Sequence, residues 1–161
     1  LMRNMTIPQY KAKYIISDAA REGRKNDYPM GEIYSPIGKP ARKAYSLFPA
    51  IDEAGKGFEY IDELLRASFY EGINIGEDEY LQSLVESLNL DWSFIKKDLN
   101  SRKWKKVLDQ NLQDMYAGNC WGVPSFKITD QDGSNPFYLW GQDRMWLLKE
   151  EIFKRIGNRD D

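Results

Sequence analysis

The sequence has 161 residues, of which 42% are hydrophobic and 30% charged, and its formal net charge is −2. Charges of both signs are interspersed, so no basic face for nucleic acid or anionic lipid is indicated. No apolar run approaches the roughly 20 residues of a membrane-spanning helix, and we therefore expect a soluble protein with no nucleic-acid and no membrane partner. A single cysteine, Cys120, excludes a disulfide within these residues, and histidine is absent, so we predict no metal site.

The chain is predicted to be helical as far as Gly118. Apolar residues recur at helical spacing in residues 7–24, after Ala41, in residues 58–69 and in residues 80–88. Asp91 is the predicted N-cap of a short helix, and Ser101 that of a longer one. In residues 58–69 we expect Phe58, Ile61, Leu64, Leu65 and Phe69 to form the inward apolar face of the helix.

Strand patterns begin only after Gly118. Residues 125–129 alternate in polarity, a DQDGSN turn follows, and residues 137–140 form an apolar run, which together predict a β-hairpin. A last helix is predicted from about Gln142 to Ile156. Two strands of about five residues make a marginal sheet by themselves. We therefore expect further strands to pair with this hairpin.

Two motifs flank the hairpin: GVPSF at residues 122–126 and WGQDR at residues 140–144. In combination they resemble the C-terminal half of the thioredoxin-like domain in the DsbA-like superfamily. Within it they are most similar to the branch of 2-hydroxychromene-2-carboxylate isomerases and kappa-class glutathione transferases. The resemblance implies an α/β, thioredoxin-like fold in which residues 1–118 are a large helical insertion subdomain. Residues 119–161 would then form the C-terminal half of the thioredoxin-like domain, with its cis-proline loop, hairpin and terminal helix.

Members of that family begin with a strand, a helix and a second strand, and no such unit precedes Leu1 here. We expect roughly 40 to 60 additional N-terminal residues, the length of one strand–helix–strand unit, which an intact-mass measurement would reveal. The family places its activating residue there, a serine or, in oxidoreductase relatives, the cysteine of a CxxC motif. We therefore predict no catalytic residue within residues 1–161.

The resemblance also implies a glutathione site. The Val123–Pro124 peptide is expected to be cis, so that the main chain of Val123 binds the cysteinyl unit as a strand binds a sheet edge. The start of the last helix, at Gln142 and Asp143, suits the γ-glutamyl end, because free N–H groups bind a carboxylate and Asp143 binds the ammonium. Asn4 is a further predicted glutathione contact.

Roles are also predicted for other residues near these motifs. Trp121 and Trp140 are predicted to border an apolar substrate cleft, and Cys120 is expected to be a buried small residue rather than a redox thiol. Without the resemblance, Asp143 would be interpreted as a helix cap, and Arg144 as the partner of a nearby acid.

The function that the resemblance implies is a glutathione-dependent isomerase or transferase. Glutathione would be the cosubstrate, and the second substrate a small hydrophobic electrophile, aromatic or unsaturated. A homodimer in the cytoplasm is expected. Two alternatives stay open: a DsbA-like thiol–disulfide oxidoreductase, which needs a CxxC motif, and a non-catalytic thioredoxin-like binding module.

Overall fold

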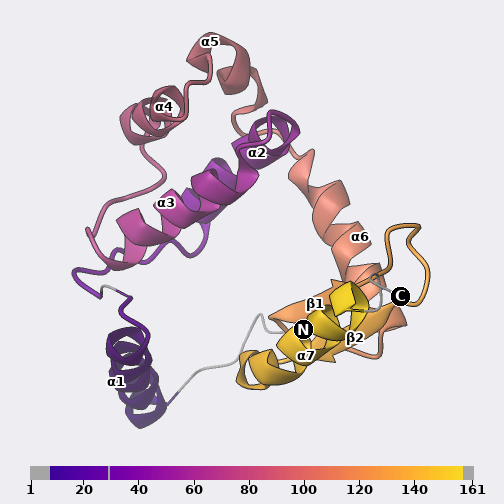
Figure 1. Ribbon diagram of the computed structural model, residues 1–161. Helices are drawn as coiled ribbons and strands as arrows, with labels where there is room; N and C mark the ends of the chain where they lie inside the picture. The colour runs from indigo at the N-terminus through magenta and orange to yellow at the C-terminus, as the bar shows by residue number, and fades with distance from the viewer. Residues whose placement is uncertain (1–7, 29, 158–161) are drawn as a thin grey trace. The chain divides into compact units, whose positions relative to one another are not determined.

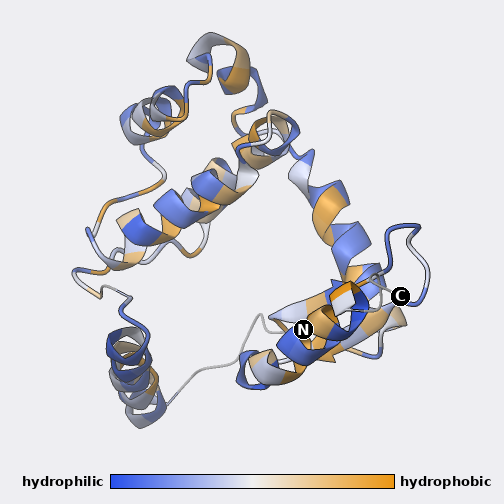
Figure 2. Ribbon diagram, in the orientation of Figure 1, coloured by the Kyte–Doolittle hydropathy of each residue, from blue (hydrophilic) through white to orange (hydrophobic). Residues whose placement is uncertain are grey.

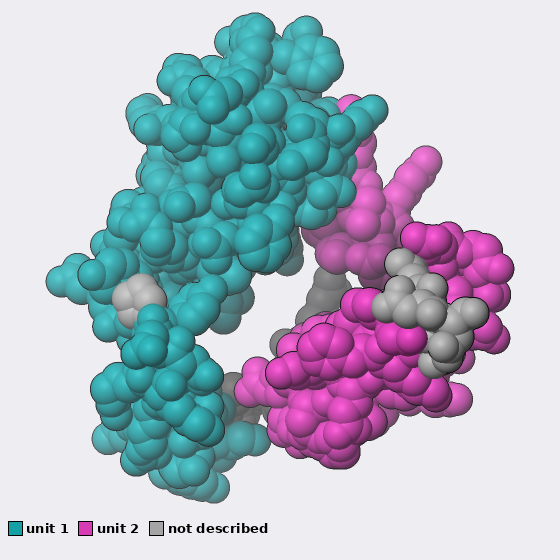
Figure 3. Space-filling model, viewed as in Figure 1, with its two compact units in different colours: residues 1–102 teal, residues 103–161 magenta. Residues whose placement is uncertain are grey.

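A computed structural model describes residues 8–28 and 30–157, with helices first and one β-hairpin late in the chain (Figure 1). The chain divides into two compact units, Leu1–Arg102 and Lys103–Asp161 (Figure 3). Unit 1 contains α1 (Gln9–Lys25), α2 (Lys39–Glu53), α3 (Gly57–Phe69), α4 (Asp78–Ser87), α5 (Trp92–Ile95) and the 3₁₀ turn η1 (Lys96–Asp98). Unit 2 contains α6 (Trp104–Ala117), β1 (Ser125–Ile128), β2 (Phe137–Trp140), the 3₁₀ turn η2 (Gln142–Arg144) and α7 (Met145–Gly157).

Unit 1 has a closed apolar core between α2, α3, α4 and α5. Its buried members are Ala44, Leu47, Ile51, Tyr60, Leu64, Ala67, Ile75, Leu81, Leu84, Val85 and Ile95. The hydroxyl of Tyr60 donates a hydrogen bond of 2.9 Å to the carbonyl of Ala44, so the polar end of this fully buried side chain is satisfied. Burial raises the pKa of the Tyr60 phenol well above its ordinary value, because the anion would lose its hydration.

The predicted inward face of α3 is partly wrong. Phe58 is 83% exposed and Leu65 is also exposed, whereas Tyr60, Leu64 and Ala67 are buried. The buried stripe follows the spacing i, i+4, i+7, as helical geometry requires. Its members include a tyrosine and an alanine, which a ranking by hydrophobicity places below phenylalanine.

One of the two predicted caps is confirmed. The carboxylate of Asp91 accepts a hydrogen bond of 2.8 Å from the N–H of Ser93, and the side chain and backbone of Ser93 hold the pKa of Asp91 below its ordinary value. Ser101 is not the N-cap of α6, which begins at Trp104. The hydroxyl of Ser101 lies 3.5 Å from the carbonyl of Ser46 instead.

Unit 2 is built on the predicted hairpin. Strands β1 and β2 are antiparallel, with Ser125 opposite Trp140 and Phe126 opposite Leu139. Within the described residues the sheet has these two strands only, so each has one unpaired edge, and the further strands that we expected are not among them. Apolar and hydrophilic segments alternate along α6, as in an amphipathic helix (Figure 2).

The far end of the hairpin is bound to α7 through Arg155. Its guanidinium donates to Asp130 at 2.8 Å, to the carbonyl of Asn135 at 2.8 Å and to Glu151 at 2.7 Å. Side-chain charge therefore fixes the hairpin turn on the terminal helix. Helix α6 belongs to compact unit 2, although its residues fall within the stretch 1–118 assigned to the insertion, and that assignment stays a prediction.

Candidate functional site

The two motifs meet at the end of the hairpin opposite its turn. The N–H of Gly141 donates a hydrogen bond of 3.0 Å to the carbonyl of Pro124. The Val123–Pro124 peptide is cis, as the motif predicts. Val123 directly precedes Pro124, and Gln142 and Asp143 directly follow Gly141. This hydrogen bond therefore brings the predicted binding residues together.

Two tryptophans reinforce this junction. The rings of Trp121 and Trp140 have their centroids 4.0 Å apart with an angle of 34° between the planes. A side chain at Gly122 would put its Cβ 2.6 Å from Nε1 of Trp140, so only glycine lets the indole lie there. The tryptophan pair thus packs the proline loop onto the end of β2.

The main chain of Val123 is available to a ligand. Its N–H and carbonyl make no hydrogen bond within the described part of the chain, and its side chain is 89% exposed. The hydroxyl of Ser125 donates to the carbonyl of Gly122 at 2.5 Å and so closes the loop on its inner side. An extended peptide could bind alongside Val123 through main-chain hydrogen bonds.

The WGQDR segment forms a turn before α7. Gly141 has a φ of +103°, and η2 then leads directly into α7, so the predicted helix start is confirmed with a tighter first turn. The Nη1 atom of Arg144 donates to the carbonyl of Trp140 at 3.2 Å and to Oδ1 of Asp143 at 3.1 Å. The first N–H groups of such a turn have no intrahelical acceptor and remain free for an anion.

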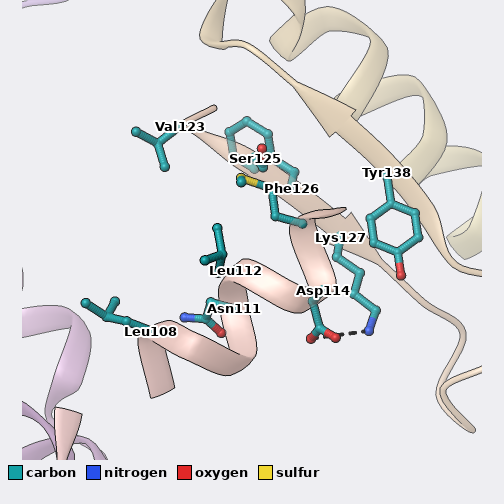
Figure 4. A pocket seen from close by; sticks show the side chains of 10 residues that line it. Leu108, Asn111, Leu112, Asp114, Val123, Ser125, Phe126, Lys127 and Tyr138 are labelled. Atoms are coloured by element: carbon teal, nitrogen blue, oxygen red, sulfur yellow. Dashed lines mark ion pairs between the residues drawn. The ribbon is translucent and has the colours of Figure 1, made fainter. Parts of the chain in front are cut away.

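A cleft of about 550 Å³ lies between α6 and β1 within unit 2 (Figure 4). Its lining consists of Leu108, Asn111, Leu112, Asp114, Met115, Val123, Ser125, Phe126, Lys127 and Tyr138. Val123 lies at one end of the cleft, and an ion pair of 3.6 Å joins Lys127 to Asp114. Neither Trp121 nor Trp140 belongs to this lining.

Residues 3–153 match the family described as DSBA-like thioredoxin domain. The chain belongs to this family. Among curated proteins, this DSBA-like chain is 34% identical over 88 residues to the uncharacterized protein YwbO of Bacillus subtilis (strain 168). The match covers 54% of this chain and 44% of YwbO, so the chain spans less than half of that relative.

Two solved structures resemble the DSBA-like chain in fold. The structure of 2-hydroxychromene-2-carboxylate isomerase has a TM-score of 0.73 and 20% identity, over 94% of this chain and 71% of that one. The cytosolic disulfide reductase DsbM from Pseudomonas aeruginosa has a TM-score of 0.66 and 21% identity, over 94% and 80% of the two chains. The predicted DsbA-like thioredoxin fold is confirmed, as a largely helical chain with a small sheet.

Cys120 and Asn4 are the other residues considered for this site. Cys120 is buried, as expected, and its Sγ lies 3.7 Å from the carbonyl of Gly118. Asn4 lies outside the described residues. In residues 8–28 and 30–157, no group of three or more cysteine or acidic side chains could hold a metal ion. None of the helices described could cross a bilayer.

The motifs contain Gly122, Gly141 and Arg144, but sequence reasoning gave the two glycines no role and Arg144 only that of the partner of a nearby acid, which is Asp143. The glycines permit the close approaches on which the junction depends, and Arg144 connects β2 to Asp143. One signal for the glycines was present, because the dipeptide Trp-Gly occurs at the start of each motif region, at residues 121–122 and 140–141. At Gly122 the backbone passes close to the Trp140 indole, and at Gly141 it passes close to the side chains of Asp143 and Arg144.

Proposed function

We propose that the protein is a glutathione-dependent enzyme of the 2-hydroxychromene-2-carboxylate isomerase type. The observation that carries the proposal is the hydrogen bond between the carbonyl of Pro124 and the N–H of Gly141. It joins a loop suited to an extended thiol peptide to a turn suited to an α-amino-acid group. Glutathione contains both parts in one molecule.

In the proposed complex, the main chain of Val123 hydrogen-bonds the cysteinyl unit of glutathione. The free N–H groups at Gln142 and Asp143 bind the γ-glutamyl carboxylate, and the carboxylate of Asp143 binds the ammonium. The exposure of Val123 and of the Asp143 side chain supports this arrangement, because a ligand can reach both from solvent.

The proposed reaction begins when the glutathione thiolate adds to an electrophilic carbon of a small aromatic or unsaturated substrate, forming a carbon–sulfur bond. Breaking that bond after the substrate has changed geometry returns the thiolate and gives an isomer. Keeping the bond, with a proton added to the substrate, gives a conjugate. We assign thiol activation to no described residue, because Cys120 is buried and the hydroxyl of Ser125 donates within its own loop.

The enzyme is proposed to act as a homodimer in the cytoplasm. Exposed apolar residues gather on α7, and a second subunit covering them would remove apolar area from water. They are Met145, Trp146, Ile152, Phe153 and Ile156. Light scattering of the full-length protein at micromolar concentration should give twice the subunit mass. A single-subunit mass across that range contradicts the dimer.

Calorimetric titration of the full-length protein with glutathione tests the site. Asp143→Ala should weaken binding by about 1–3 kcal/mol, or roughly 5- to 160-fold, since a charge-assisted hydrogen bond is lost. The matched control is Asp18→Ala, which removes an exposed carboxylate whose partner Arg21 lies on α1. If the wild-type protein does not bind glutathione, or if both variants bind like the wild type, the proposed site is wrong.

A second candidate is a thiol–disulfide oxidoreductase, favoured by the fold likeness to the disulfide reductase DsbM. That activity needs a pair of cysteines, and these 161 residues contain only Cys120. Turnover of a disulfide substrate by the full-length protein would support it. A binding module without catalysis, the third alternative, would bind a thiol peptide and show neither activity.

A further inference from the structure

We propose that a pocket in unit 1 binds a small organic cation, a protonated amine carried on an apolar body. The pocket has a volume of about 400 Å³, within the roughly 300 to 1,000 Å³ that is usual for small-molecule sites. None of its residues belongs to GVPSF or WGQDR, so the inference is independent of the proposed function. The lining of this unit 1 pocket consists of Tyr28, Met30, Asp62, Leu65, Arg66 and Phe69.

The main chain holds the walls of the unit 1 pocket in place. Three main-chain hydrogen bonds of 2.8 to 3.3 Å join residues 31–34 to residues 68–70 at the end of α3. A Cβ at Gly31 would collide with the main chain of the second segment, so glycine permits this close approach. The N–H of Tyr28 donates a further hydrogen bond of 2.8 Å to the carbonyl of Gly23, near the end of α1. A ligand therefore does not have to order the segments that flank the pocket.

Most of the lining is apolar and exposed to solvent. Met30 and Phe69 are each 37% exposed, and the side chains of Tyr28 and Leu65 are more exposed still. Leu65 and Phe69 are four residues apart on α3, so they lie on the same side of the helix. A ligand that covers these four side chains would remove their apolar area from water. The ligand body that fits this lining is therefore aromatic or aliphatic.

The one positive charge in the lining, on Arg66, is already paired. Its guanidinium donates to Glu63 from Nε at 3.0 Å and from Nη2 at 2.8 Å, and to Glu71 from Nη1 at 2.5 Å. Two carboxylates thus surround one guanidinium, and the local charge is negative even before Asp62 is counted. An anionic ligand would be repelled by this arrangement, whereas a cation would be attracted.

The carboxylate of Asp62 is the polar group that remains for a ligand. Among the described residues it forms no ion pair, and the hydroxyl of Tyr28 donates to its Oδ1 over 3.4 Å, which is long for a hydrogen bond. An ammonium beside Asp62 would gain a charge-assisted hydrogen bond, and the rings of Tyr28 and Phe69 attract a cation that lies over their faces. The charge of the pocket therefore selects an amine, and its apolar lining selects the body that carries the amine.

Titration of the full-length protein, followed by the NMR signals of its methyl groups, tests the pocket with three probes. They share a phenylethyl body: 2-phenylethylamine is cationic, 2-phenylethanol is neutral and 3-phenylpropanoate is anionic. The amine should shift the methyl signals of Met30 and Leu65 and should bind about tenfold or more tightly than the alcohol, because it alone forms the charge-assisted hydrogen bond. The propanoate should bind most weakly. Asp62→Asn should lower the affinity for the amine to that for the alcohol, and should leave the affinity for the alcohol within about twofold.

The matched control is Asp18→Asn, which neutralises an exposed carboxylate on α1 and should change none of the affinities. Leu65→Arg tests the apolar wall: it should abolish binding of the amine and, because Leu65 is exposed, should leave the circular dichroism spectrum unchanged. The inference is overturned if the amine shifts neither methyl signal, if the alcohol binds as tightly as the amine, or if Asp62→Asn keeps the wild-type affinity. An equal loss of affinity in Asp18→Asn would indicate attraction by overall charge and overturns it as well.

Discussion

Units 1 and 2 use their apolar residues differently. Unit 1 buries a continuous cluster between α2, α3, α4 and α5. The buried apolar residues described in unit 2 are Cys120, Leu139 and Leu148, while much of α6 and α7 remains exposed. Unit 2 instead fixes its motifs by hydrogen bonds, ion pairs and close approaches at glycine. Substitutions in the core of unit 1 should therefore act on stability, and substitutions at the motif junction of unit 2 should act on ligand binding.

The largest effect is expected at Leu47, whose side chain is fully buried in unit 1. Leu47→Ala should lower the free energy of unfolding by about 2–5 kcal/mol, because it removes apolar contacts and leaves a cavity. Urea unfolding followed by circular dichroism measures this. Phe58→Ala is the control on the same unit: its side chain is exposed, and its effect should stay within about 0.5 kcal/mol. Equal losses in the two variants would contradict a closed core.

A substitution at Gly122 tests the same comparison in unit 2. Gly122→Ala should weaken glutathione binding about tenfold or more, since the added Cβ forces the Trp140 indole away from the loop and shifts Val123. The free energy of unfolding of unit 1, followed by hydrogen exchange in α2 and α3, should stay unchanged. Gly157→Ala is the matched control, because a Cβ there meets nothing within 4 Å. Loss of protection in α2 and α3 in Gly122→Ala would show that the two units are not separable in this way.

A smaller effect is expected from the hydroxyl of Tyr60. Tyr60→Phe should cost about 1 kcal/mol at neutral pH, because the buried hydrogen bond to Ala44 is lost. The folded-state pKa is raised above the ordinary value of 10.0, so this residue stabilises the fold below pH 10 and destabilises it increasingly as the pH rises further.

Unfolding measured between pH 8 and 12 tests the same tyrosine. Wild type should lose stability above pH 10, and Tyr60→Phe should lose less. Part of the loss should persist, since burial also raises the pKa of Tyr80, to about 12. Identical alkaline profiles would mean that Tyr60 ionises without unfolding the core.

The smallest expected change concerns the cap of α5. Asp91→Ala should lower stability slightly at pH 7 by removing the hydrogen bond to the N–H of Ser93. Because the folded-state pKa of Asp91 is lowered from 3.8, its contribution is present above that pH and is lost as the pH falls below it. Asp91→Asn should keep most of the cap and lose the pH dependence. Thermal melts at pH 7 and pH 3 compare the three proteins.

How far the sequence predicts this molecule depends on the kind of contact. The helices of unit 1, the hairpin and the helix after WGQDR follow from periodicity and turn residues, which are local properties. The inward position of Tyr60 does not, because it depends on a hydrogen bond to Ala44 from another helix. Ser101 fails as a cap for the same reason, since its hydroxyl lies near Ser46, far away in sequence.

In the candidate site, too, local features were predicted from the sequence and contacts between distant residues were not. Val123, Pro124, Gln142 and Asp143 are predicted from motifs, and the structure brings them together. The pairing of Arg144 with a nearby acid was also predicted, and its partner is Asp143, at 3.1 Å. Its hydrogen bond to the carbonyl of Trp140 could not be predicted, because the direction of that carbonyl is set by the end of β2.

The tilted pair of Trp121 and Trp140 gives the site an optical signature of its own. Two indoles whose ring centroids are 4.0 Å apart interact electronically, so they should produce a distinct near-ultraviolet circular dichroism signal, unlike those of Trp92, Trp104 and Trp146. A ligand bound along Val123 and against Asp143 would lie within three residues of Trp121 and of Trp140 in the sequence. Its binding should therefore change this signal. The protein therefore carries a built-in spectroscopic reporter at its candidate site, readable without any label.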